Sequence, residues 1–140
     1  MKLTEHFELE EMACTTHKEL AKTNLEEAKK IMGRMYQLAG FAERIREIVG
    51  KPLIINSGFR CVKLNNRVGG SLTSQHIYGE ALDVRVSGKS ATELFQIIAA
   101  SDLKYDQLIL EKVGSSQWVH VSIGSKKEKL KYENGKYTRI

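Results

Sequence analysis

Three side chains with metal-binding atoms stand out in the sequence, two histidines and one aspartate. Six residues separate His76 from Asp83, and His120 lies downstream in the alternating apolar segment WVHVS. Two imidazoles and one carboxylate give three protein ligands, the number found in catalytic zinc sites that keep a fourth position open for water. On this interpretation, the rest of the chain is a scaffold that brings His76, Asp83 and His120 to one point, where they could hold one Zn²⁺ per chain.

A fourth side chain, Glu111, reaches the same centre if two expected strands pair. DQLILE (106–111) and QWVHVS (117–122) flank a turn around Gly114. Alternate residues of a strand share a face, so in a hairpin Glu111 and His120 project from the same side of the sheet. A carboxylate beside a metal-bound water is placed to act as a general base. The alternative is that the strand simply ends at the surface with Glu111.

Helices and strands must bring these residues together, and the apolar spacing predicts where they lie. Helices are expected at 3–12, opened by Thr4, at 25–49, capped by Thr23 or Asn24, and at 91–100, opened by the capping box Ser90–Glu93. A short helical stretch at 61–68 and the loop 71–79 precede the strand 81–86. The remaining strands are expected at 53–56, 106–111 and 117–122, and around an Asn134-Gly135 hairpin turn. This order predicts an α+β fold with a small antiparallel sheet flanked by helices, in a single domain 1–140.

Composition limits the class of protein. The chain has 140 residues, of which 41% are hydrophobic and 28% charged, and it has no run of about 18 apolar residues that would predict a membrane helix. Cys14 and Cys61 are too few for a disulfide framework, and we expect free thiols. The N-terminal segment MKLTEHFELEEM carries acidic residues where a signal peptide has its apolar core, so we expect synthesis in the cytoplasm without a signal peptide.

The net charge of +5 fits either a solvated basic surface or an acidic partner. Nucleic acid is not an expected partner, because no recognition motif occurs and the aromatic residues are not interleaved with basic ones. We also expect no membrane partner and a monomeric protein.

Four segments together resemble a known family. SGFR, NNRVGG, SQHIYGEALD and WVHVS are similar to the M15 zinc peptidases of the D-alanyl-D-alanine carboxypeptidase type, above all the short branch known from phage endolysins and prophage genes. The family pattern S-x-H, G-x-A-x-D and a later strand histidine corresponds to Ser74–His76, Gly79–Asp83 and His120. The resemblance extends from HFELEEM to Ile123, and the hedgehog signalling domain is a more distant relative with the same metal site.

The resemblance implies roles for further residues. His76, Asp83 and His120 would bind zinc, and Arg60 would lie near the substrate carbonyl, where the alternative is a surface salt bridge. Substrate contacts or ligand orientation are implied for Ser74 and Gln75. Two aromatic residues complete the candidate substrate-binding set. They are Tyr78 in the loop and Trp118, which either walls the pocket or belongs to the core.

Two functional interpretations differ in whether the chain has a general base. The D-alanyl-D-alanine enzymes place a glutamate three residues before the last histidine, where this chain has Gln117. In the first alternative Glu111 is the base, by analogy with the hedgehog domain, which has a glutamate at the end of the preceding strand. In the second alternative the chain has no base. The first alternative implies a zinc metallopeptidase that hydrolyses peptidoglycan stem or cross-link peptides, as a carboxypeptidase or an endopeptidase, and acts on the cell wall after release if it is a lysin. The second implies a zinc-containing module of phage or prophage origin that binds cell-wall peptide or protein.

Overall fold

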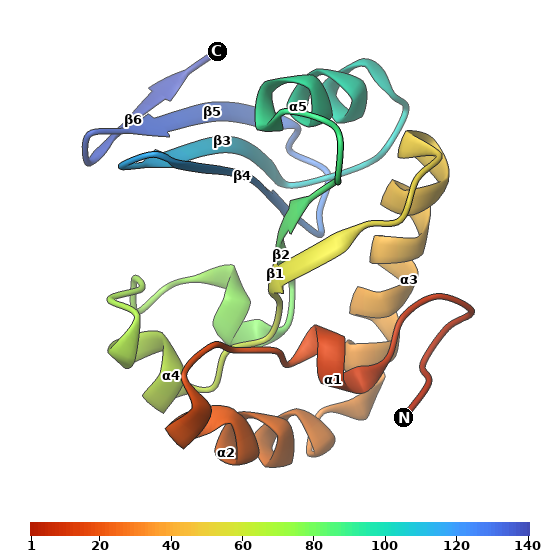
Figure 1. The fold of residues 1–140 in the computed structure, drawn as a ribbon, viewed down its shortest axis with the longest axis vertical. Helices are drawn as coiled ribbons and strands as arrows, with labels where there is room; N and C mark the ends of the chain where they lie inside the picture. The colour runs from red at the N-terminus through yellow and green to blue at the C-terminus, as the bar shows by residue number, and fades with distance from the viewer.

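A six-stranded sheet organises the molecule, which is described over residues 1–140 by a computed structural model (Figure 1). The spatial order of the strands is β1-β2-β4-β3-β5-β6. Their bounds are β1 Ile54–Ser57, β2 Ala81–Arg85, β3 Gln107–Val113, β4 Ser116–Ser122, β5 Glu128–Glu133 and β6 Lys136–Arg139. Helices and one sheet occur together, so the predicted α+β class is confirmed.

The sheet is mixed, whereas the sequence predicted an antiparallel one. Every neighbouring pair is antiparallel except β3 and β5, which run parallel with Ile109 opposite Leu130. The cause lies in the pairing of β4, which has β3 on one side and β2 on the other. The chain that leaves β4 therefore pairs with the free edge of β3. The next strand, β5, begins opposite the start of β3, so the two strands run in the same direction.

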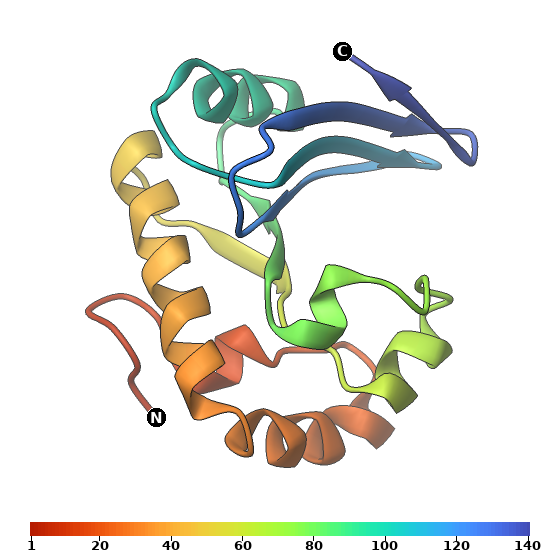
Figure 2. The same ribbon diagram turned by 180° about the vertical axis from the view of Figure 1, so that it is seen from behind.

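The helices lie on both sides of this sheet. Helix α5 packs on β3 and β4, and the long α3 contacts α1, α2 and α5. On the other side, Figures 1 and 2 show α4 and a short 3-10 helix, η1, facing the sheet. Their bounds are α1 Leu9–Met12, α2 Lys18–Lys29, α3 Met32–Val49, α4 Val62–Arg67, η1 Gln75–Tyr78 and α5 Ala91–Ala100. None of the helices is both long and apolar enough to cross a membrane.

Two of the helix predictions were wrong in their bounds. The expected helix at 3–12 is only α1, and its N-cap is Glu8, in a capping box with Glu11, instead of Thr4. The expected helix at 25–49 is two helices, because Ile31 leaves helical geometry with φ −129° and ψ 48°. The first of them, α2, begins at Lys18, so Thr23 and Asn24 lie inside it and cap nothing. The break lets α2 and α3 run in different directions (Figure 1).

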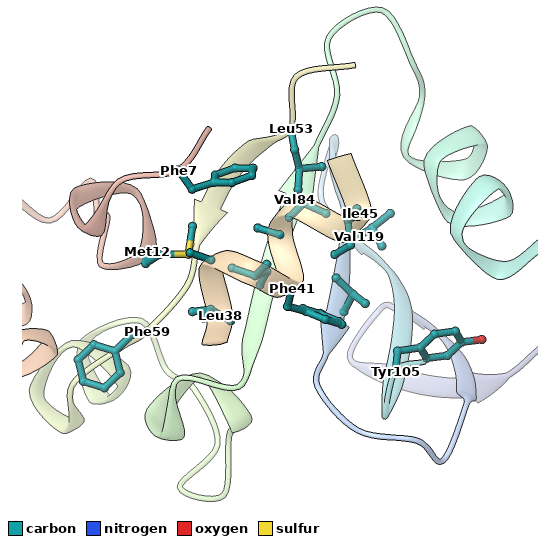
Figure 3. Close-up of a cluster of buried hydrophobic side chains, with 14 of the residues drawn as sticks. Phe7, Met12, Leu38, Phe41, Ile45, Leu53, Phe59, Val84, Tyr105 and Val119 are labelled. Atoms are coloured by element: carbon teal, nitrogen blue, oxygen red, sulfur yellow. The ribbon is translucent and has the colours of Figure 1, made fainter. Parts of the chain in front are cut away.

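The two faces of the sheet differ in character because side chains alternate along each strand. Leu82, Val84, Leu108, Val119 and Val121 are buried on the face that carries the helices. Residues of α3, among them Leu38, Phe41 and Ile45, meet this face in the hydrophobic core (Figure 3). Alternation therefore sends Asp83, Ile109 and His120 to the opposite face, toward α4 and η1.

Two local motifs were predicted correctly. Ser90 and Glu93 form the expected capping box at the start of α5, with both bonds present. Asn134 and Gly135 connect β5 to β6 with φ values of 54° and 75°, the left-handed pair that a type I′ turn requires.

Truncation of Leu108 tests the packed face of the sheet. The side chain is fully buried in a central strand, so Leu108→Ala should lower the free energy of unfolding by about 2–5 kcal/mol. The same substitution at Leu72, which is 77% exposed, should change it by less than about 0.5 kcal/mol. Urea unfolding followed by circular dichroism measures both. Equal effects at the two positions would contradict the assignment of the faces.

Candidate active site

Strand register brings three of the predicted residues together on the open face of the sheet. Asp83 of β2 is the direct partner of His120 on β4. On the other side of β4, Glu111 of β3 pairs with Trp118 and lies one pleat from His120. The predicted hairpin between the two strands is present, and Glu111 and His120 share a face.

His76 reaches the site from η1. The Ser74 hydroxyl accepts a hydrogen bond from the His76 backbone N–H and caps the 3-10 helix, which ends at Gly79 with φ +68°. The ring Nδ1 of His76 donates to the Gly58 carbonyl at 2.7 Å. Since the ring is 1% exposed and tied at Nδ1, its Nε2 is directed at the cluster. Such a bond to the second nitrogen is typical of metal-binding histidines.

The distances within the cluster fit tetrahedral zinc. His76 Nε2 lies 3.3 Å from Asp83 Oδ1, and His120 Nδ1 lies 3.2 Å from the same oxygen. Ligands about 2.0–2.1 Å from a tetrahedral zinc ion are separated from one another by about 3.3 Å. His76 Nε2 is buried without any hydrogen-bond partner, as a nitrogen that serves as a metal ligand would be. The three residues therefore fit a zinc site, as the sequence predicted.

Burial and neighbouring charge set the protonation of the cluster. Burial opposes ionisation of Asp83, but His76 and His120 outweigh it and hold the pKa of Asp83 well below its usual range. Burial lowers the pKa of His76, which favours the neutral imidazole that binds a metal. Burial, reinforced by Asp83, raises the pKa of Glu111 to about 7 against the opposing effect of His120 and Arg60. A carboxylate of that pKa is suited to proton transfer near neutrality.

Arg60 carries an unpaired guanidinium into the site. Its backbone N–H donates to the His76 carbonyl at 3.0 Å, which ties the SGFR segment to η1. The side chain has no ion pair, so the surface salt bridge considered as its alternative role is absent from the structure. Gly70 leaves room for it, since a Cβ there would lie 3.2 Å from Arg60 Nη1 and closer still to Asn65.

These residues line a cavity of about 880 Å³ between the sheet and the α4–η1 side. Ser74, Gln75 and Trp118 also line it, so three of the four predicted substrate contacts lie at the site. Gln75 is tied to Asp106, with Nε2 donating to a carboxylate oxygen at 3.0 Å. Tyr78 lies outside the cavity, half-exposed, with its carbonyl bonded to Arg34.

Gln117 lies outside the cavity as well. Because side chains alternate along β4, Gln117 projects from the face opposite to Trp118 and His120. It is exposed beside Lys112, its partner across the strands. The identity of this residue therefore has no direct effect on the protonation of groups in the cavity.

Asn24 is a positioning residue that the sequence did not reveal. It is fully buried in α2, where its Nδ2 donates to the carbonyls of Ala13 and Phe59, and its Oδ1 accepts from the Cys61 N–H at 2.7 Å. The bonds to Phe59 and Cys61 hold the backbone on both sides of Arg60. Asn24 thus fixes the segment from which Arg60 extends and against which His76 is oriented.

Zinc titration tests the three ligands. A ligand at about one hundred times its Kd stabilises the folded state by about 2.7 kcal/mol, so zinc should raise the thermal midpoint of the wild-type protein. Asp83→Asn replaces the shared carboxylate by a weaker neutral ligand and should abolish this rise. His17→Ala, in a histidine that lines the cavity outside the cluster, should retain it. A zinc-induced rise in Asp83→Asn equal to that of wild type would refute the ligand set.

Removal of the Asn24 amide tests the positioning role. Asn24→Ala leaves two carbonyls and one N–H buried without partners, and each costs about 1–3 kcal/mol, so unfolding should become easier by about 3 kcal/mol or more. The matched variant Asn66→Ala, at an exposed asparagine of α4, should change stability by less than about 0.5 kcal/mol. Urea unfolding compares the two, and a small effect at Asn24 would show that its three bonds are dispensable.

Comparison with known proteins agrees with this geometry. Residues 5–122 match the peptidase M15 family. A curated relative, the zinc D-Ala-D-Ala carboxypeptidase of Streptomyces albus G, is 38% identical over 55 residues, which make up 39% of this chain and 22% of that protein. The aligned part is thus about a fifth of the relative's length, whereas the family match includes every residue of the metal cluster and Glu111. The chain belongs to the peptidase M15 family.

Proposed function

We propose that this protein is a zinc metallopeptidase that hydrolyses peptide bonds in cell-wall peptides. The observation that carries the proposal is the placement of Glu111, whose carboxylate lies 3.7 Å from His120 Nδ1 beside a three-ligand cluster. The name of the relative, a zinc D-Ala-D-Ala carboxypeptidase, supports peptidoglycan peptides as the substrate class. On this proposal the chain is synthesised in the cytoplasm and acts at the cell wall, where the substrate lies.

The side chains around the cluster divide the work of hydrolysis. His76, Asp83 and His120 would hold the zinc ion, which would lower the pKa of the attacking water and polarise the scissile carbonyl. Glu111 accepts a proton from the attacking water and returns it to the leaving amine, which its pKa near neutrality favours. Arg60, unpaired and always charged, donates hydrogen bonds to the oxyanion that develops on the carbonyl.

The course of the cavity favours an endopeptidase over a carboxypeptidase. Toward β1 it continues past the ligands to Asn56 and Thr16, and toward β6 it continues to Tyr137, so substrate can extend on both sides of the metal. A carboxypeptidase must also hold a terminal carboxylate, usually with a cation. Arg60 is the only lysine or arginine in the cavity lining, and the oxyanion already requires it. We therefore propose cleavage of an internal bond of the peptides.

The binding module that Gln117 suggested has less support. That alternative depended on the lack of a base at position 117, which faces away from the cavity. On this proposal Glu111 is the base, and its carboxylate beside the cluster supports turnover over simple binding.

Digestion of purified peptidoglycan tests the proposal. Zinc-loaded protein should release fragments whose masses locate the cleaved bond, and the metal content should be one zinc per chain. Fragments cut within stem or cross-link peptides support an endopeptidase, and release of a single terminal residue would establish a carboxypeptidase instead. Stoichiometric zinc without any cleavage would overturn the peptidase and favour the binding module.

Substitution of the base tests the role of Glu111. Glu111→Gln keeps the size of the side chain but accepts no proton, and loss of a general base should lower kcat about 10²–10⁴-fold. Zinc content should be unchanged, because Glu111 is not among the three ligands. Glu133→Gln is the matched control, since Glu133 pairs with Lys112 and Lys131 away from the cavity and should leave kcat as in wild type. Full activity of Glu111→Gln would remove Glu111 from the mechanism.

A further inference from the structure

The C-terminal hairpin β5–β6 extends the floor of the active-site cavity. Leu130, Tyr132 and Tyr137 of this hairpin line the same cavity as the zinc ligands. The hairpin begins at Glu128, beyond the residues 5–122 that match the peptidase M15 family. This part of the cavity is therefore built by a segment outside the family match.

Strand register joins the hairpin to the site without a gap. Tyr137 of β6 pairs with Tyr132 of β5, which pairs with Glu111 of β3, which pairs with Trp118 of β4. The four side chains form one row across the same face, with aromatic residues on both sides of the proposed base. In the neighbouring row, Leu130 stands beside Ile109, the cross-strand partner of His120.

The chemistry of this surface is aromatic and apolar. The two tyrosine rings pack at a centroid distance of 4.7 Å with an interplanar angle of 55°. Leu130 is a buried side chain of the cavity wall, while Tyr137 is 61% exposed and free to contact a ligand. No lysine or arginine lines this end, so a charged terminus has no partner there.

We propose that Tyr132 and Tyr137 form a subsite that binds the substrate peptide beyond the cleaved bond. The inference rests on the proposed peptidase function, and it predicts that the enzyme prefers long peptides to short ones. The rings offer flat, amphipathic area to an extended peptide and its small apolar side chains, with hydroxyl groups for the backbone amides. Because the row passes through Glu111, a peptide placed for cleavage continues directly onto the rings.

Peptide length is the variable that tests the subsite. The probes are a short stem peptide, the same peptide extended at either end, and the same peptide cross-linked to a second stem. Wild-type protein should have a lower KM for one of the extended series than for the short peptide. In Tyr132→Ala/Tyr137→Ala the KM for that series should rise about tenfold, equivalent to about 1.4 kcal/mol, with kcat retained.

Matched variants separate the subsite from general damage. Tyr36→Ala, at a tyrosine of α3 that is 46% exposed and outside the cavity, should leave all constants as in wild type. Tyr132→Phe and Tyr137→Phe keep the rings and should retain most of the preference for long peptides. Tyr137→Ala alone serves if the double variant fails to fold, since its exposed side chain contributes little to the core. A normal zinc-induced rise of the thermal midpoint shows that the metal site of each variant is intact.

The outcomes are distinct. A double variant that loses affinity only for the extended peptides supports the subsite. The proposal is overturned if wild type shows no dependence on length, if short and long peptides are affected equally, or if Tyr137→Phe lowers kcat, which would make the hydroxyl part of the chemistry. Calorimetric binding of the same peptides to zinc-loaded protein decides the matter even without turnover. Length-dependent binding without cleavage would refute the peptidase and retain the subsite.

Discussion

The antiparallel pairing of β2 with β4 is the constraint on which the site depends. It sets Asp83 directly opposite His120, so two of the three ligands meet whenever the two strands are in register. A slip of β2 by one residue would send Asp83 to the helix-covered face and bring apolar side chains of β2 into the cavity. The buried valines and leucines of the same strands oppose such a slip, because their packing fixes the register. The hydrophobic core on one face of the sheet thus fixes the positions of Asp83 and His120 on the other face.

The third ligand depends on backbone hydrogen bonds instead of strand register. His76 comes from a single turn of 3-10 helix, and the Gly58 carbonyl and the Arg60 N–H hold it from the SGFR segment. Gly58 itself admits no side chain, since a Cβ there would overlap the Met12 carbonyl oxygen. Asn24 closes the same assembly from α2. His76 and Arg60 are therefore parts of one hydrogen-bonded unit.

The sequence predicted the elements that carry a strict period or a local motif. The alternation of apolar and polar residues predicted the strands that carry Asp83, Glu111 and His120. The Ser90 capping box and the Asn134-Gly135 turn were predicted because their signals are local.

The parallel placement of β5 could not be predicted, since it follows from the occupied edge of β4. The break at Ile31 was missed because the apolar stripe continues through it. Asn24 looked like a helix cap, as a buried asparagine carries no sequence signal of its three backbone partners. Tyr132 and Tyr137 were predictable as a cross-strand pair around the turn, but not as part of the cavity.

The pairing of Asp83 with His120 has a consequence for how the protein folds and unfolds. The two residues are 37 positions apart in the chain, and β2 is joined to β4 only after α5 and β3 have been traversed. Contacts of such separation incur the loop-closure entropy before they contribute any stability, so we expect this part of the sheet to close late on the folding route. Interactions that form after the transition state act on the unfolding rate and leave the folding rate nearly unchanged. A metal bound across β2 and β4 is therefore expected to prolong the lifetime of the folded chain instead of hastening its formation.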